Sequence, residues 1–145
     1  MIYIAADHAG FQLKKHLIQY LKIKGLDVED CGVFEMDPED DYPDFSYPCA
    51  LRVAQGKPGQ DFGIVIGGSG QGEAIVANKV RGIRAAIYNG GKPEIAKTAK
   101  EHNNANVLSI GARFVSGDEA DMAVRIFLET AFSNSQRHLR RIAKY

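Results

Sequence analysis

Short runs of β-branched and other apolar residues alternate along the chain with longer stretches in which apolar residues recur every three or four positions. The short runs are typical of buried strands and the longer stretches of amphipathic helices. Strands are expected at Ile2–Ala6, near Val28, and at Phe62–Ile66, Ile83–Ile87 and Val107–Ile110. Helices are expected after Gly10, over about Tyr47–Gln55, after Gly72, over about Pro93–Glu101 and Glu119–Phe132, and from about Ser135.

This alternation predicts a single domain over residues 1–145, because no repeat, linker or low-complexity segment divides the chain. Strands joined by helices pair in parallel through right-handed crossovers. The expected fold is therefore α/β, a three-layer α/β/α sandwich around a five-stranded parallel Rossmann-like sheet. The helix from about Ser135 is an extra C-terminal helix. It is polar with little apolar stripe, so we expect it to pack on something outside its own core.

Composition and charge narrow the class of protein. The chain is 45% hydrophobic and 25% charged, and 18 basic residues balance 18 acidic ones. Zero net charge gives no reason to expect a nucleic-acid or membrane-surface partner, and the apolar runs are too short to span a bilayer. Asp7 and His8 interrupt the N-terminus before a signal peptide can form, and Cys31 and Cys49 are expected to be free thiols. We expect a cytoplasmic protein.

The acidic residues are unevenly distributed. Nine of the 18 lie between Asp27 and Asp44, where no Lys or Arg occurs. A solvated loop is the simplest interpretation, and contact with the basic C-terminal helix of a partner subunit is the alternative. Neither Asp40-Asp41 nor the four histidines have the spacing of a known metal site, so no metal is predicted.

The loop Gly67–Ala74, with sequence GGSGQGEA, carries the most informative chemistry. Its glycines have Walker A spacing, but Glu73 replaces the lysine; Ile75 breaks the dinucleotide fingerprint, and Gln71 breaks a nucleophile elbow at Ser69. What remains is a glycine loop that turns N–H groups toward an anion. Glu73 is either an acid that stabilises the helix dipole or a general base beside an anion hole. The Ser69 hydroxyl either caps the helix or contributes to that hole.

Three arginines are candidates for a phosphate clamp. Arg137 and Arg141 are four residues apart, so a helix places them on one face, and Arg113 follows a strand end. Compensation of the helix dipole is the alternative explanation for the C-terminal pair. His8 and His102 lie next to loops at the presumed mouth of the site, although a lone histidine is more often structural.

Five motifs together resemble those of a known family, in the same order. They are Ala5-Ala6-Asp7-His8-Ala9-Gly10, the Gly67–Glu73 loop followed by Ala77-Asn78-Lys79, Glu101-His102-Asn103-Asn104-Ala105-Asn106, Gly111-x-Arg113, and Gln136-Arg137-His138-x-Arg140-Arg141. Over essentially the whole chain the sequence resembles ribose-5-phosphate isomerase B and the related galactose-6-phosphate isomerase subunits. Many members carry a catalytic cysteine at the position of Gly67. This chain is similar to a second branch, which has glycine there and a glutamate at the position of Glu73.

The resemblance implies a cofactor-independent aldose–ketose isomerase that interconverts D-ribose 5-phosphate and D-ribulose 5-phosphate through a cis-enediolate. It further implies a homodimer with shared active sites, and dimers that pair into tetramers are a further possibility. The implied catalytic residues are Glu73 as base, His102 in ring opening or proton donation, and Ser69. The implied substrate-binding residues are Asp7, His8, Gly68, Gly70, Gln71, Gly72 and Asn103, and the implied phosphate-binding residues are Arg113, Arg137, His138 and Arg141. A hexose 6-phosphate of the allose or galactose type as substrate, and a non-catalytic phosphosugar-binding module, remain the alternatives.

Overall fold

The computed structural model describes all residues, 1–145, and contains one five-stranded sheet. The strands are β1 (Ile2–Ala6), β2 (Val28–Asp30), β3 (Phe62–Gly67), β4 (Ala85–Tyr88) and β5 (Val107–Gly111). They run in the spatial order β2-β1-β3-β5-β4, and every neighbouring pair is parallel. The five-stranded parallel sheet expected from the alternation of patterns is confirmed.

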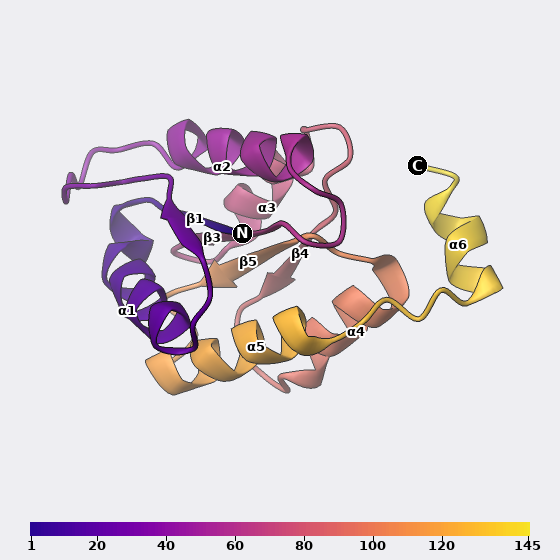
Figure 1. Cartoon of the computed structure of the whole chain (residues 1–145). Coiled ribbons are helices and arrows are strands. Elements are labelled where there is room, and N and C mark those ends of the chain that lie inside the picture. The colour runs from indigo at the N-terminus through magenta and orange to yellow at the C-terminus, as the bar shows by residue number, and fades with distance from the viewer.

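Helices cover both faces of the sheet (Figure 1). One face carries α1 (Phe11–Ile23), α4 (Glu94–Asn103) and α5 (Gly117–Glu129), and the other carries α2 (Pro43–Gln55) and α3 (Gln71–Ala77). Alternate strand residues point to opposite faces, so Ile64 and Ile66 join the core beneath α1, α4 and α5, whereas Val65 joins the core beneath α2. This arrangement is the three-layer sandwich that was predicted.

Several elements differ from the expectation in their bounds: α5 ends at Glu129 rather than near Phe132, and β4 spans Ala85–Tyr88 rather than Ile83–Ile87. Helix α2 begins at Pro43 rather than near Tyr47, because proline is well suited to the first helical turn, where its missing N–H costs nothing. Helix α3 ends at Ala77, so the buried Val80 lies beyond the end of the helix. Ile75 lies on the outer side of α3 and is 61% exposed.

The C-terminal helix α6 (Gln136–Ile142) stands apart from the layers, beyond the end of α4 (Figure 1). None of its residues is buried. This fits the polar character of its sequence, and the expected partner outside its own core stays a prediction. No helix of the chain has the length and apolar character needed to cross a membrane.

The strand order creates a switch point between β1 and β3. The chain leaves β1 toward β2 on one side, and it leaves β3 toward β4 on the other side. In such sheets the two diverging connections open a crevice beyond the carboxyl ends of the strands. Asp7 follows β1 at this point, and Gly68 follows β3.

Candidate active site

A cleft of about 370 Å³ lies at this switch point. It is lined by residues that follow β1, β3 and β5 and by one residue of the loop before α2: Asp7, His8, Gly68, Ser69, Gly72, Glu73 and Arg113 are joined there by Tyr42. The structure therefore brings together the predicted residues of the first motif, the glycine loop and the loop after β5. Tyr42 was not predicted, because nothing in its local sequence distinguishes it from a core tyrosine.

The glycine loop is held in place from beneath. Gly70 has φ +76°, which suits glycine, and it begins α3. The hydroxyl of Ser109, a fully buried residue on β5, donates to the Gly70 carbonyl at 2.5 Å, and the Arg113 N–H donates to the Gly68 carbonyl at 3.1 Å. The N–H groups of Gly68, Ser69 and Gly70 make no hydrogen bond within the protein. These unpaired donors leave the loop able to bind an anion.

The two polar side chains of the loop differ in their surroundings. The Ser69 hydroxyl accepts a hydrogen bond from the Gln71 N–H at 3.3 Å, but the N-cap residue of α3 is Gly70, so Ser69 is not the helix cap. The Gln71 side chain is exposed, and Gln71 does not line the cleft. Ser69 does line the cleft, so its hydroxyl remains within the site.

Glu73 is buried at the base of the cleft, with 4% of its surface exposed. Its carboxylate lies over Gly67, in the space that a Cβ atom at position 67 would occupy. Burial raises the pKa of Glu73 above its ordinary value and the nearby charge of Asp7 adds to the rise, while a hydrogen bond from the residue's own backbone N–H opposes it. Burial therefore outweighs the backbone hydrogen bond, and the direction of this pKa shift is one that the sequence leaves open.

Asp7 and His8 are fixed by hydrogen bonds of their own. The Asp7 carboxylate is 7% exposed and accepts from the Gly10 N–H at 3.1 Å, which caps the short 3-10 helix η1 (His8–Gly10). His8 contacts Asp40, whose Oδ1 lies 2.6 Å from Nδ1 and 3.1 Å from the His8 backbone nitrogen. The hydrogen bond to Asp40 raises the pKa of His8. This pair was not predicted, because 32 residues separate its members.

Asp7, His8 and Asp40 also form the group that could hold a metal ion. One ligand atom from each lies within 4.8 Å of the others. Two of the carboxylate oxygens already accept protein hydrogen bonds, Asp7 Oδ1 from Gly10 and Asp40 Oδ1 from His8. The geometry is thus that of a hydrogen-bonded cluster, and it differs from the closed ligand sets of structural metal sites.

The remaining predicted residues lie elsewhere in the same chain. Helix α4 starts after the carboxyl end of β4 and runs back to the amino end of β5. His102 and Asn103 therefore lie near the amino ends of the strands, whereas Glu73 lies beyond their carboxyl ends. Asn103 borders a groove of about 800 Å³, which is also lined by Ile142 of α6. A single chain does not bring this second group of predicted residues to the cleft.

The rings of His102 and His138 stack, with centroids 4.5 Å apart and planes inclined by 13°. Partial loss of hydration lowers the pKa of the half-buried His138, and repulsion from His102 and the nearby arginines lowers it further. Arg137 and Arg141 are exposed, and neither forms an ion pair within the chain. These residues form a basic, unpaired surface around the C-terminal helix.

The acidic segment and the cysteines have structural partners. Asp30 and Glu29 of the acidic segment bind Lys14 at 2.6 Å and Arg52 at 2.7 Å, respectively, in addition to the contact between His8 and Asp40.

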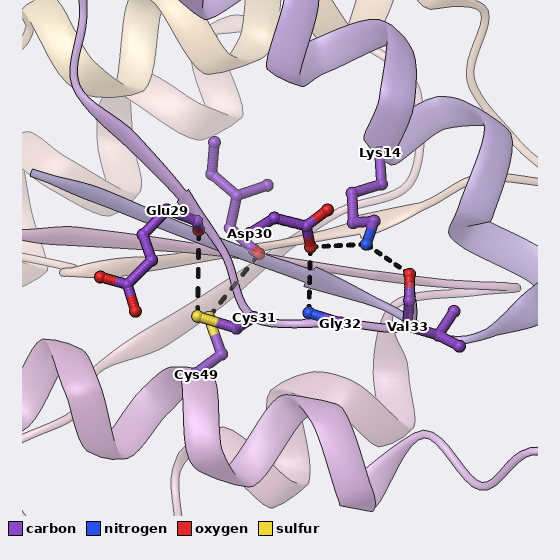
Figure 2. Close-up of polar contacts among 8 residues, drawn as sticks. Lys14, Glu29, Asp30, Cys31, Gly32, Val33 and Cys49 are labelled. Carbon is purple, nitrogen blue, oxygen red and sulfur yellow. Dashed lines mark hydrogen bonds and ion pairs between the residues drawn. The ribbon is translucent and has the colours of Figure 1, made fainter. Parts of the chain in front are cut away.

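Cys31 and Cys49 are free thiols, as expected; Cys49 is fully buried and Cys31 half-buried. Figure 2 shows the two sulfur atoms next to each other; the Cys31 thiol donates to the Glu29 carbonyl at 3.9 Å, and the Cys49 thiol donates to the Ile64 carbonyl at 4.0 Å.

Comparison with known proteins gives full-length matches. The Ribose/Galactose Isomerase family matches residues 2–145. Ribose-5-phosphate isomerase B of Mycobacterium leprae is 46% identical over 141 residues, which cover 97% of this chain and 85% of that protein. The crystal structure of ribose-5-phosphate isomerase B from Mycoplasma genitalium with bound ribulose-5-phosphate is 41% identical, with a TM-score of 0.91, and the match covers 99% of this chain and 91% of that one. The enzyme from Thermotoga maritima is 40% identical with a TM-score of 0.90, over 99% and 94% of the two chains.

The fold, the cleft at the switch point and these likenesses define the class: the protein is a sugar-phosphate aldose–ketose isomerase with a Rossmann-like fold. More particularly, the chain belongs to the ribose/galactose isomerase family. The resemblance seen in the five ordered motifs is thereby confirmed.

Proposed function

We propose that the protein interconverts D-ribose 5-phosphate and D-ribulose 5-phosphate through a cis-enediolate, with Glu73 as the base. The observation that carries this proposal is the position of the Glu73 carboxylate, which is buried over Gly67 where a side chain at that position would lie. The names of the relatives support a pentose 5-phosphate as substrate, as does the ribulose-5-phosphate in the Mycoplasma genitalium structure.

The reaction moves one hydrogen from C2 to C1 of the open-chain sugar and one from O2 to O1. Glu73 removes the C2 proton; the electrons of that bond form the C1–C2 double bond, and the carbonyl electrons move to O1. The same carboxyl then returns the proton to C1, while the O2 proton is transferred to O1. A carboxylate with a raised pKa is a stronger base than an ordinary one, and its pKa lies closer to the working pH.

The loop and the surrounding charges supply the rest of the site. The unpaired N–H groups of Gly68, Ser69 and Gly70 stabilise the negative charge of the enediolate, and loss of one such donor typically costs ~2.7–4 kcal/mol of barrier. Asp7 and His8 hold the substrate. The exposed guanidinium of Arg113 at the mouth of the cleft binds the phosphate.

A second copy of the chain completes the site. His102 and Asn103 lie near the amino ends of the strands of their own sheet, away from the cleft. Arg137, His138 and Arg141 lie on α6, which stands apart from the layers of its own chain. In a homodimer, these residues reach the cleft of the partner, where His102 opens the sugar ring and the arginines grip the phosphate. Mixing Glu73→Gln with Arg137→Ala subunits then restores part of the activity, because one hybrid site is intact. Absence of rescue despite demonstrated subunit exchange would mean self-contained sites.

The direct test measures ribulose 5-phosphate formation from ribose 5-phosphate with a chelator present. Glu73→Gln should fold and lose roughly 10²–10⁴-fold in kcat. Glu94→Gln, which neutralises an exposed acid in the first turn of α4, is the matched control and should keep wild-type activity. Near-wild-type turnover of Glu73→Gln would refute the base. Turnover of hexose 6-phosphates alone would change the substrate, and saturable binding without turnover would identify a binding module.

A further inference from the structure

Asp40, a residue outside the lining of the cleft, contacts His8, which lines it. The Asp40 side chain is 6% exposed. Oδ1 accepts from both the Nδ1 and the backbone N–H of His8, at 2.6 and 3.1 Å. Oδ2 is buried without any hydrogen-bond partner. The imidazole is therefore the group that balances the charge of this carboxylate.

The loop that carries Asp40 is anchored at both ends. At its start, the buried Lys14 ammonium donates to Asp30 Oδ1 and to the Val33 carbonyl, each at 2.6 Å, and Asp30 also accepts from the Gly32 N–H (Figure 2). At its end, the chain enters α2 at Pro43. These anchors place the Asp40 carboxylate at a defined position, which is what the orientation of a partner side chain requires.

The hydrogen bond determines which way His8 presents its ring. A carboxylate only accepts hydrogen bonds, so Nδ1 carries a proton and Nε2 is the ring nitrogen left for the cleft. The charged groups around His8 are Asp40, Asp7 and Arg113, and Glu73 lies in the same cleft. The contact with Asp40 raises the pKa of His8, with help from Asp7, against opposition from burial and from Arg113. The imidazolium form offers Nε2–H as a charged donor to an anionic ligand.

We propose that Asp40 is a positioning residue, which accepts a hydrogen bond from His8 Nδ1 and thereby orients the ring so that Nε2 faces the phosphorylated sugar. This role rests on the proposed function for the identity of the ligand. It assigns a task to one member of the acidic segment, for which the sequence indicates a solvated loop or contact with a partner subunit. Asp40 acts through His8 and does not itself touch the substrate.

The first measurement is the pKa of His8, obtained by titration with NMR of the imidazole ring. The chain has four histidines, so the His8 signal is assigned by its loss in His8→Ala. In wild type the pKa of His8 should be raised above its ordinary value by the contact with Asp40, and Asp40→Asn should lower it. Glu39→Gln removes an exposed carboxylate from the neighbouring position and should leave the pKa unchanged. An unchanged His8 pKa in folded Asp40→Asn would overturn the proposal.

The second measurement is a double-mutant cycle, read as Kd for inorganic phosphate and as KM for ribose 5-phosphate. Asp40→Asn should weaken both roughly tenfold, the usual effect of losing a charge-assisted hydrogen bond, with kcat nearly unchanged. In the His8→Ala background the same substitution should have no effect. Equal losses in both backgrounds would assign Asp40 a structural role, and absence of phosphate binding by wild type would remove the proposed ligand. If phosphate binds as expected while ribose 5-phosphate is not turned over, the proposed function fails and the positioning role stands.

Discussion

Lys100 of α4 is an ammonium group buried among apolar and aromatic atoms. It is 5% exposed, and its Nζ lies 4.0 Å from the ring centroid of Phe62 and 5.6 Å from that of Phe127. Its one hydrogen bond goes to the Ala105 carbonyl at 3.1 Å, and no carboxylate pairs with it. Burial, with a smaller contribution from Arg84, lowers the pKa of Lys100 from its ordinary 10.5 to about 8.

This shift predicts how stability depends on pH. The unfolded chain binds the Lys100 proton below pH 10.5 and the folded chain only below about pH 8, so the unfolded state holds more protons in between. The free energy of unfolding therefore rises with pH across this window, by ~3 kcal/mol from this group. Below pH 8 the full penalty of the buried charge is present, and above pH 10.5 it is absent.

Lys100→Met removes the ammonium while keeping most of the side-chain length. Urea unfolding should be followed by far-UV circular dichroism from pH 7 to 10.5 for both proteins. The free energy of unfolding of wild type minus that of Lys100→Met removes the titrations that both proteins share. This difference should rise by ~3 kcal/mol as the pH rises. Lys97→Met, at an exposed lysine of the same helix, should give a flat difference. A flat difference for Lys100→Met would refute the reasoning.

Three further outcomes are expected. Gly67→Ala places a Cβ where the Glu73 carboxylate lies, so kcat should fall while circular dichroism shows a folded chain; unchanged kcat would contradict that geometry. Because the base must be deprotonated and its pKa is raised, kcat/KM should fall with decreasing pH at a midpoint above 4.5, and a midpoint at or below 4.5 would count against burial of Glu73. The neighbouring Cys49 lowers the pKa of Cys31, whereas Cys31 and burial raise the pKa of Cys49. Iodoacetamide should therefore label Cys31 first, as mass spectrometry of the digested protein can show; equal labelling would refute the asymmetry.

The architecture of this protein could be predicted from its sequence because the signals are local. Strands and helices differ in the period of their apolar residues, and the alternation of the two leaves few topologies other than a parallel sheet. Asp7 and the Gly67–Glu73 loop directly follow strands. Because the carboxyl ends of parallel strands meet on one side of the sheet, these positions predicted half of the site. Helix starts were less certain, as at Pro43, because proline both ends and begins helices.

Other properties of the site depend on segments far apart in the chain. Only the packed structure shows that burial raises the pKa of Glu73, because desolvation is the sum of contacts from several elements. The contact of Asp40 with His8 and the support of Gly70 by Ser109 join residues 32 and 39 positions apart, and no local pattern marks such pairs. Likewise, the placement of His102 away from Glu73 follows from the direction in which α4 crosses the sheet. The sequence by itself determined the elements and the loop that carries the chemistry, whereas the tertiary structure decided which charges meet and how much water reaches them, because both depend on distance in space.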